Sequence, residues 1–487
     1  MSSHIKDARL VKTRCYIEGR WQDAENGSVI AVHNPATGAL ICHVPDMGEA
    51  ETIRAVEAAH RAMQSWRQTP AKTRAALLRR WFDLIMANQE DLGILLTLEQ
   101  GKPLAEAKGE IAYGASYIEW FAEEAKRIYG DTIPSLNADQ RILVFKEPVG
   151  VCAAITPWNF PNAMITRKAA PALAAGCAII LRPASLTPLS ALALAELAER
   201  AGLPGGLFSV ITGKSAPIGK VLTGHDLVKK LSFTGSTEIG RQLMAQCAAT
   251  VKKTSMELGG NAPFIVFGDA DIEAAVEGAM VSKFRNSGQT CVCANRLYVQ
   301  DSIYDMFLDR FTKAVAKLKV GDGLSDGVNQ GPMIDEAAVA GVEEHIADAL
   351  RLGGSLVCGG KRHALGGTFF EPTIVRDANA VMRVAKEETF GPLAPVFRFD
   401  TEAEAIAMAN DTEFGLASYF YARDVGRIFR VAEALEYGMV AINTGLLSNE
   451  AAPFGGVKQS GLGREGSKYG IMDYLQIKYL CIAGVGK

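Results

Sequence analysis

Strand-like and helix-like patterns alternate along most of the chain. Short runs of β-branched and other apolar residues occur at 178–181, 207–211 and 229–233, and each is followed by a turn residue and then by apolar residues at helical spacing. A second block with the same alternation begins near Gly259. This order predicts an α/β architecture with a largely parallel sheet.

Three sections depart from this alternation. The segment 130–147 is extended in character and precedes a proline, so we expect a projecting β element there. The C-terminal run 478–485 predicts a last strand that a neighbouring subunit could share. Residues 51–126 carry helical spacing with few breakers, which predicts three successive amphipathic helices. The three runs are 51–66, 72–92 and 105–127.

Length and composition narrow the class of protein. A chain of 487 residues is long enough for two or three domains, and its 48% hydrophobic and 22% charged residues are typical of a folded globular protein. Lys and Arg total 51 against 54 for Asp and Glu, and no run of five basic residues occurs. The composition therefore argues against nucleic acid or an anionic membrane as a partner.

The distribution of apolar residues and cysteines favours a cytoplasmic protein. The first twenty residues lack the apolar stretch of a signal peptide, and no apolar run approaches the roughly 20 residues that span a bilayer. Nine cysteines are scattered without the paired spacing of a disulfide framework, and the seven histidines do not cluster with other ligands. We expect free thiols, no membrane span and no metal site.

The segment 231–247 is a candidate phosphate-binding turn. Gly235 and Gly240 flank the predicted start of a helix, where free backbone N–H groups and the helix dipole favour an anion. The Gly-x4-Gly spacing differs from the dinucleotide fingerprint, and no Gly-Lys-Ser/Thr follows. By itself the segment fits an ordinary glycine-bounded turn equally well.

Three residues have the chemistry of a covalent catalytic site. Cys291 lies in NSGQTCVCAN among small and polar neighbours, although most cysteines in such a chain are inert core residues. Glu257 ends a β-like run before two glycines, and its alternative is a surface glutamate at a strand end. Asn159 lies between prolines and aromatic residues, where its amide could face an oxyanion or simply form a turn.

Six motifs occur in order along the chain: TPWNFP at 156–161, FTGSTEIG at 233–240, MELGGNAP at 256–263, GQTC at 288–291, EETFGP at 387–392 and PFGGVKQSGLGRE at 453–465. Taken together, they resemble the aldehyde dehydrogenase superfamily, and within it the succinate-semialdehyde dehydrogenases. The resemblance implies an α/β fold with a Rossmann-like cofactor domain, a catalytic α/β domain and a small β oligomerisation element. It places cofactor binding in 1–125 and 148–257, catalysis in 258–470 and oligomerisation in 126–147 and 471–487.

The family mechanism implies a role for each catalytic candidate. Cys291 would attack the aldehyde, while the Asn159 amide and the Cys291 backbone N–H stabilise the oxyanion. Glu257 would activate the water that hydrolyses the thioester, and Lys168 matches a position associated with the cofactor and with proton movement. The product would be a carboxylic acid.

The same resemblance implies a nicotinamide dinucleotide cofactor. Many NAD-specific relatives carry Glu where Ser185 stands, and its absence removes repulsion of a 2′-phosphate. Arg182 replaces the usual Lys and keeps a positive charge in a planar form suited to phosphate. We expect NADP to be preferred and NAD to be usable. The other cofactor positions are Trp158, Gly235, Ser236, Glu388 and Phe390.

Three positions match those that bind the distal carboxylate in succinate-semialdehyde dehydrogenases: Arg167, Arg285 and Ser448. Two converging guanidinium groups favour a carboxylated aldehyde, and the alternative is that both are solvated or salt-bridged. Glutarate semialdehyde differs from succinate semialdehyde by one methylene, which a pocket discriminates by only about 1–3 kcal/mol. Cys293, two residues after Cys291, matches relatives in which this pair forms a reversible disulfide.

The resemblance further implies a homodimer or homotetramer. Broader aldehyde specificity is one alternative function. A non-enzymatic relative of the same fold is a second, and the presence of Cys291, Glu257 and Asn159 together argues against it. A thiol hydrolase or a coenzyme-A-acylating enzyme is a third, and Glu257 with the cofactor motifs argues against both.

Overall fold

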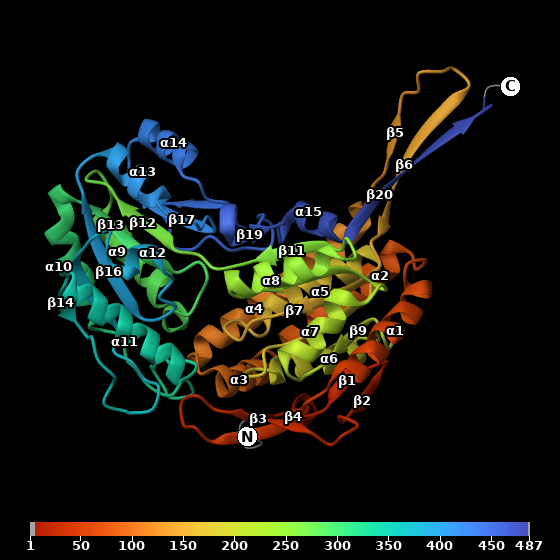
Figure 1. The fold of residues 1–487 in the computed structure, drawn as a ribbon, viewed down its shortest axis with the longest axis horizontal. Coiled ribbons are helices and arrows are strands. Elements are labelled where there is room, and N and C mark those ends of the chain that lie inside the picture. The colour runs from red at the N-terminus through yellow and green to blue at the C-terminus, as the bar shows by residue number, and fades with distance from the viewer. Residues whose placement is uncertain (1–4, 486–487) are drawn as a thin grey trace.

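The computed structural model describes residues 5–485 as two lobes and a projecting ribbon (Figure 1). The first lobe is built on an eight-stranded sheet in the order β19-β11-β10-β7-β8-β9-β1-β2, whose five central strands are parallel. A separate hairpin pairs β3 (Val29–His33) with β4 (Leu40–Pro45). The sheet strands are β1 (Cys15–Ile17), β2 (Arg20–Gln22), β7 (Val151–Ile155), β8 (Ile179–Arg182), β9 (Phe208–Val210), β10 (Val228–Thr234), β11 (Lys253–Glu257) and β19 (Gly461–Leu462).

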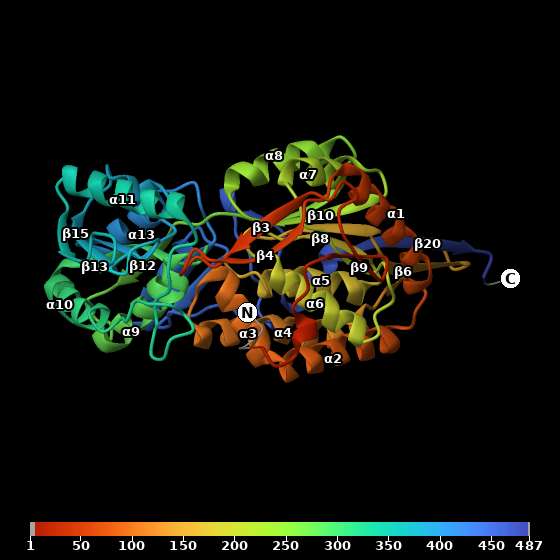
Figure 2. The same ribbon diagram turned by 90° about the horizontal axis from the view of Figure 1, so that it is seen from below.

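Helices cover both faces of this sheet (Figure 2). One layer contains α1, α7 and α8, and the other contains α5 and α6 with α2, α3 and α4 packed outside them. The predicted β-turn-helix succession after residues 178–181, 207–211 and 229–233 is present as β8-α6, β9-α7 and β10-α8. The helices are α1 (Glu49–Trp66), α2 (Ala71–Ala87), α3 (Gln89–Gln100), α4 (Leu104–Glu124), α5 (Ala163–Ala175), α6 (Leu189–Arg200), α7 (Ser215–Gly224) and α8 (Thr237–Ala248).

The prediction of three helices over 51–126 is wrong, because the structure has four. The second predicted run is divided at Asn88, whose φ of −111° and ψ of 17° lie outside the helical region. The missed helix, α3, is buried nearly all round from Asp91 to Thr97. A helix without a polar face produces no amphipathic pattern, so its periodicity was not apparent.

The second lobe is built on a seven-stranded sheet in the order β14-β15-β16-β13-β12-β17-β18, parallel except for β14 at its edge. Alternate residues of β12 pack into separate cores, Phe264 and Val266 on one face and Ile265 on the other. Helices α9 and α10 cover the first face, and α11 and α13 cover the second (Figure 2). The strands are β12 (Ala262–Val266), β13 (Ala294–Gln300), β14 (Ser355–Cys358), β15 (Thr373–Ala378), β16 (Leu393–Phe399), β17 (Ala417–Tyr421) and β18 (Met439–Ile442), and the helices are α9 (Ile272–Phe284), α10 (Tyr304–Val315), α11 (Glu336–Arg351), α12 (Arg383–Lys386), α13 (Glu402–Asn410) and α14 (Val425–Ala434).

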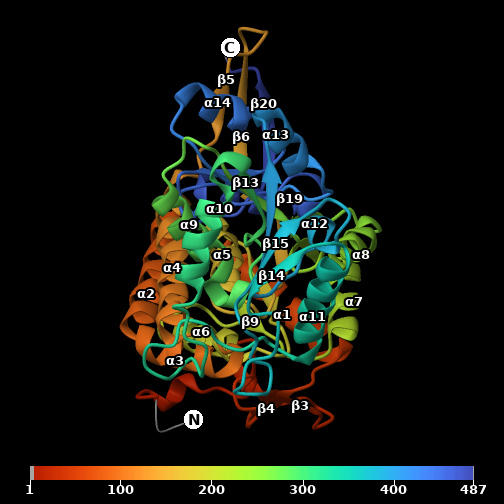
Figure 3. The same cartoon turned by 90° about the vertical axis from the view of Figure 1, so that its left-hand side faces the viewer.

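The ribbon is a three-stranded antiparallel sheet that projects from the first lobe (Figure 3). It combines β5 (Asp131–Ile133) and β6 (Gln140–Pro148) with the C-terminal β20 (Leu475–Ala483), so both predicted extended segments are strands of one sheet. No helix within residues 5–485 is long and apolar enough to cross a membrane. The remaining short helices are α15 (Ser467–Gly470) and the 3₁₀ turns at Ala8–Leu10, Ala125–Arg127, Arg285–Gly288, Asp301–Ile303, Lys458–Ser460 and Ile471–Tyr474.

Candidate active site

The carboxyl ends of the central strands of the first sheet bring the candidate residues together. Strands β7, β10 and β11 are parallel neighbours, so the segments that follow them emerge at one edge. Thr234 at the end of β10 is paired with Glu257 at the end of β11. Asn159 lies in the turn between β7 and α5. The chain then crosses from Glu257 through two glycines to β12 in the second lobe, which places the site between the lobes.

Two cavities meet at Cys291. The first has a volume of about 290 Å³ and the second about 240 Å³, and they share Phe160, Met164 and Cys291. The thiol is thus the point at which molecules bound in the two cavities can meet. The first cavity also includes Lys102, Glu106, Glu110, Tyr113, Arg167, Arg285, Ser448 and Phe454, and the second includes Trp158, Asn159, Thr234, Gly235, Ser236, Leu258, Gly259, Glu388 and Phe390.

Cys291 lies against the segment that connects the two lobes. A Cβ atom on Gly260 would lie 2.6 Å from the Cys291 carbonyl oxygen, so only glycine allows this contact. Burial raises the pKa of the Cys291 thiol to about 12, and the neighbouring Glu388 carboxyl acts in the same direction. The thiol is therefore protonated in the free protein near neutral pH, and it needs a base or a change in its surroundings to become a nucleophile.

Glu257 is a buried carboxyl group with a free oxygen. Its Oε2 atom has no hydrogen-bond partner in the described part of the chain. Burial raises the pKa of Glu257 well above its usual range, and the nearby Glu465 carboxylate adds to the shift. A carboxyl group with a raised pKa is suited to accepting a proton near neutral pH.

The side-chain amide of Asn159 has a fixed orientation. Its Nδ2 atom donates to the Gln289 carbonyl oxygen at 3.1 Å, and its Oδ1 atom accepts from the Phe160 N–H at 3.1 Å. These contacts use one amide hydrogen and leave the other available in the cavity that Asn159 shares with Cys291. The geometry is suited to donating a hydrogen bond to an oxyanion that forms at Cys291.

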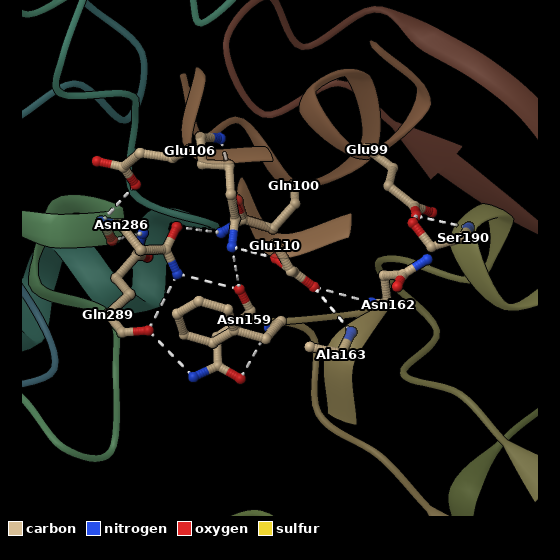
Figure 4. A network of polar contacts seen from close by, with 12 residues as sticks. Glu99, Gln100, Glu106, Glu110, Asn159, Asn162, Ala163, Ser190, Asn286 and Gln289 are labelled. Atoms are coloured by element: carbon tan, nitrogen blue, oxygen red, sulfur yellow. Dashed lines mark hydrogen bonds and ion pairs between the residues drawn. The ribbon is translucent and has the colours of Figure 1, made fainter. Parts of the chain in front are cut away.

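A buried ion pair between Lys102 and Glu110 supports this turn, and Figure 4 shows Glu110 beside Asn159, Asn162 and Ala163. The Lys102 ammonium group lies 2.6 Å from Glu110 Oε2, donates to the Asn159 carbonyl oxygen at 2.7 Å, and sits 3.9 Å from the centre of the Phe160 ring. The other Glu110 oxygen accepts from the backbone N–H groups of Asn162 and Ala163 at the start of α5. Lys102 and Glu110 therefore fix the segment that carries the Asn159 side chain and the start of α5.

Replacing Lys102 with methionine should lower the free energy of unfolding by about 3–5 kcal/mol, because Glu110 would keep a buried charge without a partner. Urea denaturation of the variant measures this. The matched double variant Lys102→Met with Glu110→Gln removes both charges and keeps an oxygen for the α5 N–H groups. It should be more stable than Lys102→Met alone, and equal or lower stability would contradict the ion-pair account.

The segment between Arg285 and Cys291 is strained and held by hydrogen bonds. Asn286 and Ser287 have φ of 53° and 56°, in the left-handed region that non-glycine residues rarely adopt. The Asn286 side chain donates to the carbonyl oxygens of Asn159 and Gln289 at 3.1 Å each (Figure 4). These hydrogen bonds thus connect the segment before Cys291 to the turn that carries Asn159.

A second buried charge cluster lies behind Glu257. Glu465 contacts the ammonium group of Lys168 and lies 2.6 Å from the Arg167 guanidinium group. Lys168 also donates to the Thr234 hydroxyl at 2.6 Å, so it reaches the second cavity through that side chain. Arg167 lies 3.9 Å from the centre of the Phe454 ring. The protein itself therefore supplies a carboxylate for Arg167.

All three predicted substrate-binding residues line the first cavity, but only one of the two arginines has an ion-pair partner in the described part of the chain. Arg285 lines this cavity without an ion-pair partner among residues 5–485, whereas Arg167 is paired with Glu465. Ser448 is half-buried and lines the same cavity. Arg285 is thus the cationic group most available to an anion.

The second cavity has the features of a dinucleotide site. Trp158 and Phe390 face each other edge to face, with ring centres 5.6 Å apart. Ser236 caps the N-terminus of α8, where N–H groups favour a phosphate. The Glu388 carboxyl accepts from the Gly260 N–H at 3.3 Å, and burial raises its pKa to about 8.

Gly240, Arg182 and Ser185 lie outside both cavities. A Cβ atom on Gly240 would lie 2.4 Å from a Leu258 side-chain atom, so this glycine allows α8 to pack beside the second cavity. Arg182 ends β8 and donates to the Ser185 hydroxyl at 2.9 Å and to the Gly213 carbonyl oxygen at 3.0 Å. Its Nε atom has no partner among the described residues, and burial lowers the pKa of Arg182 to about 10. A buried guanidinium group without an acid partner is suited to an anion.

Cys293 lines neither cavity, and its thiol is hydrogen-bonded at the end of α9. Its buried thiol donates to the carbonyl oxygens of Ser282 at 3.1 Å and Lys283 at 3.0 Å, at the end of α9. All nine cysteines are free thiols in the structure. Across residues 5–485, no group of three potential metal ligands comes together.

Sequence reasoning did not identify several residues of the site. Glu106 and Glu110 are four residues apart on α4 and line one cavity, a spacing that places two side chains on one helix face. That spacing was a usable signal. Glu465 ends the motif at 453–465, but nothing in that motif indicates its contact with Lys168, which lies 297 residues away.

The two lobes hold a thiol where two cavities meet, an arrangement suited to an enzyme that brings two small molecules together. The chain belongs to the aldehyde dehydrogenase family, whose model matches residues 21–480. It is 69% identical to a glutarate-semialdehyde dehydrogenase of Pseudomonas aeruginosa, over 99% of this chain and 100% of that protein. It is 66% identical to the NADP⁺ succinate-semialdehyde dehydrogenase of Escherichia coli, over 98% of this chain and 99% of that one. The crystal structure of succinate-semialdehyde dehydrogenase from Burkholderia pseudomallei has a TM-score of 0.98 and 64% identity, covering 98% and 99% of the two chains.

Proposed function

We propose that the protein oxidises succinate semialdehyde to succinate with NADP, through a thioester on Cys291. The observation that carries the proposal is the first cavity, which has the thiol in its wall together with the unpaired guanidinium group of Arg285. An aldehyde with a distal carboxylate can place one end at each group. The names of the two relatives above describe two such aldehydes. Glutarate semialdehyde is the second candidate for this reason.

In the proposed reaction, the Cys291 sulfur bonds to the aldehyde carbon and its proton leaves to a base. Asn159 and the Cys291 backbone N–H stabilise the resulting oxyanion, and a donor of this kind is worth about 3–4 kcal/mol in comparable enzymes. A dinucleotide held in the second cavity would accept the hydride that leaves the former aldehyde carbon as its C=O bond re-forms, which gives the thioester. Glu257 then accepts a proton from the water that hydrolyses the thioester. Lys168 holds Thr234 and Glu465 in place behind this carboxyl group.

The preference for NADP over NAD is proposed from Arg182 and Ser185. Arg182 is a buried cation without an acid partner, and Ser185 offers a hydroxyl rather than a carboxylate. A 2′-phosphate can take hydrogen bonds from both, whereas NAD lacks that group. Trp158, Ser236, Glu388 and Phe390 would hold the rest of the dinucleotide.

The three larger sheets separate the chain into parts to which different functions can be assigned. We assign cofactor binding to 1–125 and 148–257, catalysis to 258–470, and assembly of a homodimer or homotetramer to 126–147 and 471–487. Exposed apolar side chains on the ribbon support the last assignment, since they would be covered by a second copy. The free thiols support a reducing, cytoplasmic compartment. The exposed apolar side chains of the ribbon are Ile133, Leu136, Phe145, Ile477, Tyr479 and Ile482.

Redox control through Cys291 and Cys293 remains a further proposal. A disulfide would require the Cys293 thiol to leave its two carbonyl partners at the end of α9. Such a rearrangement requires the 285–293 segment to move, because disulfide geometry is narrow.

The test is initial-rate kinetics with succinate semialdehyde, glutarate semialdehyde and an uncharged aldehyde, each with NADP and with NAD. The kcat/KM of the carboxylated aldehydes should exceed that of the uncharged aldehyde by about two orders of magnitude. Arg285→Met should reduce this ratio by about 10²-fold. The exposed Arg61→Met on α1 is the charge-matched control. If the uncharged aldehyde is as good a substrate, or if Arg285→Met slows all three alike, Arg285 is not a carboxylate-binding residue.

A further inference from the structure

Two charged groups without partners face the same cavity. In the first cavity, Lys102 is paired with Glu110, and Arg167 is paired with Glu465. Neither Glu106 nor Arg285 forms an ion pair with any residue of the described chain, although both line this cavity. Its open charges are therefore one carboxyl group and one guanidinium group.

Glu106 is tied to the segment that carries Arg285. It lies in the first turn of α4, and its Oε2 atom accepts from the Asn286 N–H at 2.8 Å (Figure 4). The charged groups that act on it are Lys102, Arg285 and Glu110. Burial raises the pKa of Glu106 above its usual value, whereas Lys102 and Arg285 oppose the shift. The carboxyl group therefore sits where a change in local charge can alter its protonation.

We infer that Glu106 is the counter-charge of Arg285 in the empty cavity and takes up a proton when a carboxylated aldehyde binds. This inference rests on the proposed function, and it assigns to Glu106 the pH dependence and part of the charge selectivity of that site. The proton comes from solvent and ends on the Glu106 carboxylate. No other bond changes.

The physical reason is the repulsion of two carboxylates in one buried cavity. If the substrate carboxylate approaches Arg285, it also approaches Glu106, and two such groups in contact cannot both stay ionised without a large penalty. Below the pKa of Glu106 in the free protein, the group is already neutral and the anion binds fully. Above that pKa, binding must include proton uptake, so affinity for the anion falls by up to about tenfold per pH unit. An uncharged aldehyde has no such dependence.

The test measures proton uptake on binding of butyrate, which carries a single carboxylate and cannot react. Titration calorimetry of the full-length protein in two buffers of different ionisation enthalpy gives the number of protons bound, from about pH 5 to about pH 9. The wild-type protein should take up a fraction of a proton that grows with pH. Glu106→Gln keeps the acceptor for the Asn286 N–H and should show no uptake. Glu123→Gln, an exposed change on the same helix, should behave as the wild type.

A second readout is the direction of the affinity change. At the high end of the pH range, Glu106→Gln should bind butyrate about tenfold more tightly than the wild type, because the repelling charge is gone. Equal proton uptake in both proteins, or weaker binding by the variant, overturns the role of Glu106 alone. If butyrate binds the wild type no better than 1-butanol, the carboxylate-binding cavity itself is wrong and both proposals fail.

Discussion

Replacing Cys291 with alanine is expected to reduce kcat by about 10⁴-fold or more, since no other nucleophile is available at the junction of the two cavities. The measurement is the initial rate of reduced-cofactor formation with the best carboxylated aldehyde. The half-buried thiol makes no side-chain hydrogen bond among the described residues, so the thermal unfolding midpoint should change little. A large loss of rate with an unchanged midpoint assigns the effect to chemistry.

The matched control is Cys293→Ala, the same chemical change two residues away. Cys293 donates only to carbonyl oxygens at the end of α9, so this variant should stay within about tenfold of the wild-type rate in reducing buffer. If Cys291→Ala retains more than about 1% of the wild-type rate, or if the two variants lose activity equally, the covalent role of Cys291 is wrong.

The strands of the first sheet were predictable because local signals agree with their environment. Residues 178–181, 207–211 and 229–233 are β-rich, end in turn residues and form β8, β9 and β10. The all-buried helix α3 was missed for the opposite reason, because its pattern reflects packing on both sides and not one face. Local pattern therefore identifies elements that have an exposed side or a defined turn.

The site shows the same division between local and long-range information. Cys291, Glu257 and Asn159 were predicted as catalytic candidates because each lies in a short motif. Their supports were not, since the ion pair of Lys102 with Glu110 reaches the Asn159 carbonyl oxygen from 57 residues away. Such contacts depend on how the helices pack beside the strand ends, which no single segment encodes.

The chemistry depends on low solvent access as much as on the residues. Burial raises the pKa values of both the Cys291 thiol and the Glu257 carboxyl group, so it disfavours the charged form of each. Gly259 and Gly260 allow the connection between β11 and β12 to pass close to Glu388 and Cys291. The close approach of the backbone at this connection therefore depends on glycine at both positions.

Replacing Glu257 with glutamine should separate the two halves of the reaction. If Glu257 serves only to activate water, thioester formation stays fast and its hydrolysis slows by about 10²–10⁴-fold. Rapid mixing should then show a burst of reduced cofactor equal to the enzyme concentration, followed by a slow steady state. The wild-type hydrolysis step should accelerate as pH rises through the raised pKa of Glu257, whereas the glutamine variant should lose that dependence.

Added hydroxylamine provides the chemical control for this variant, because it attacks a thioester without help from a general base. It should restore much of the steady-state rate of Glu257→Gln and have little effect on the wild type. A different outcome would identify a different base function. If the burst itself is slowed and hydroxylamine has no effect, Glu257 removes the proton from Cys291, whose raised pKa requires such a base, and the assignment to water activation is wrong.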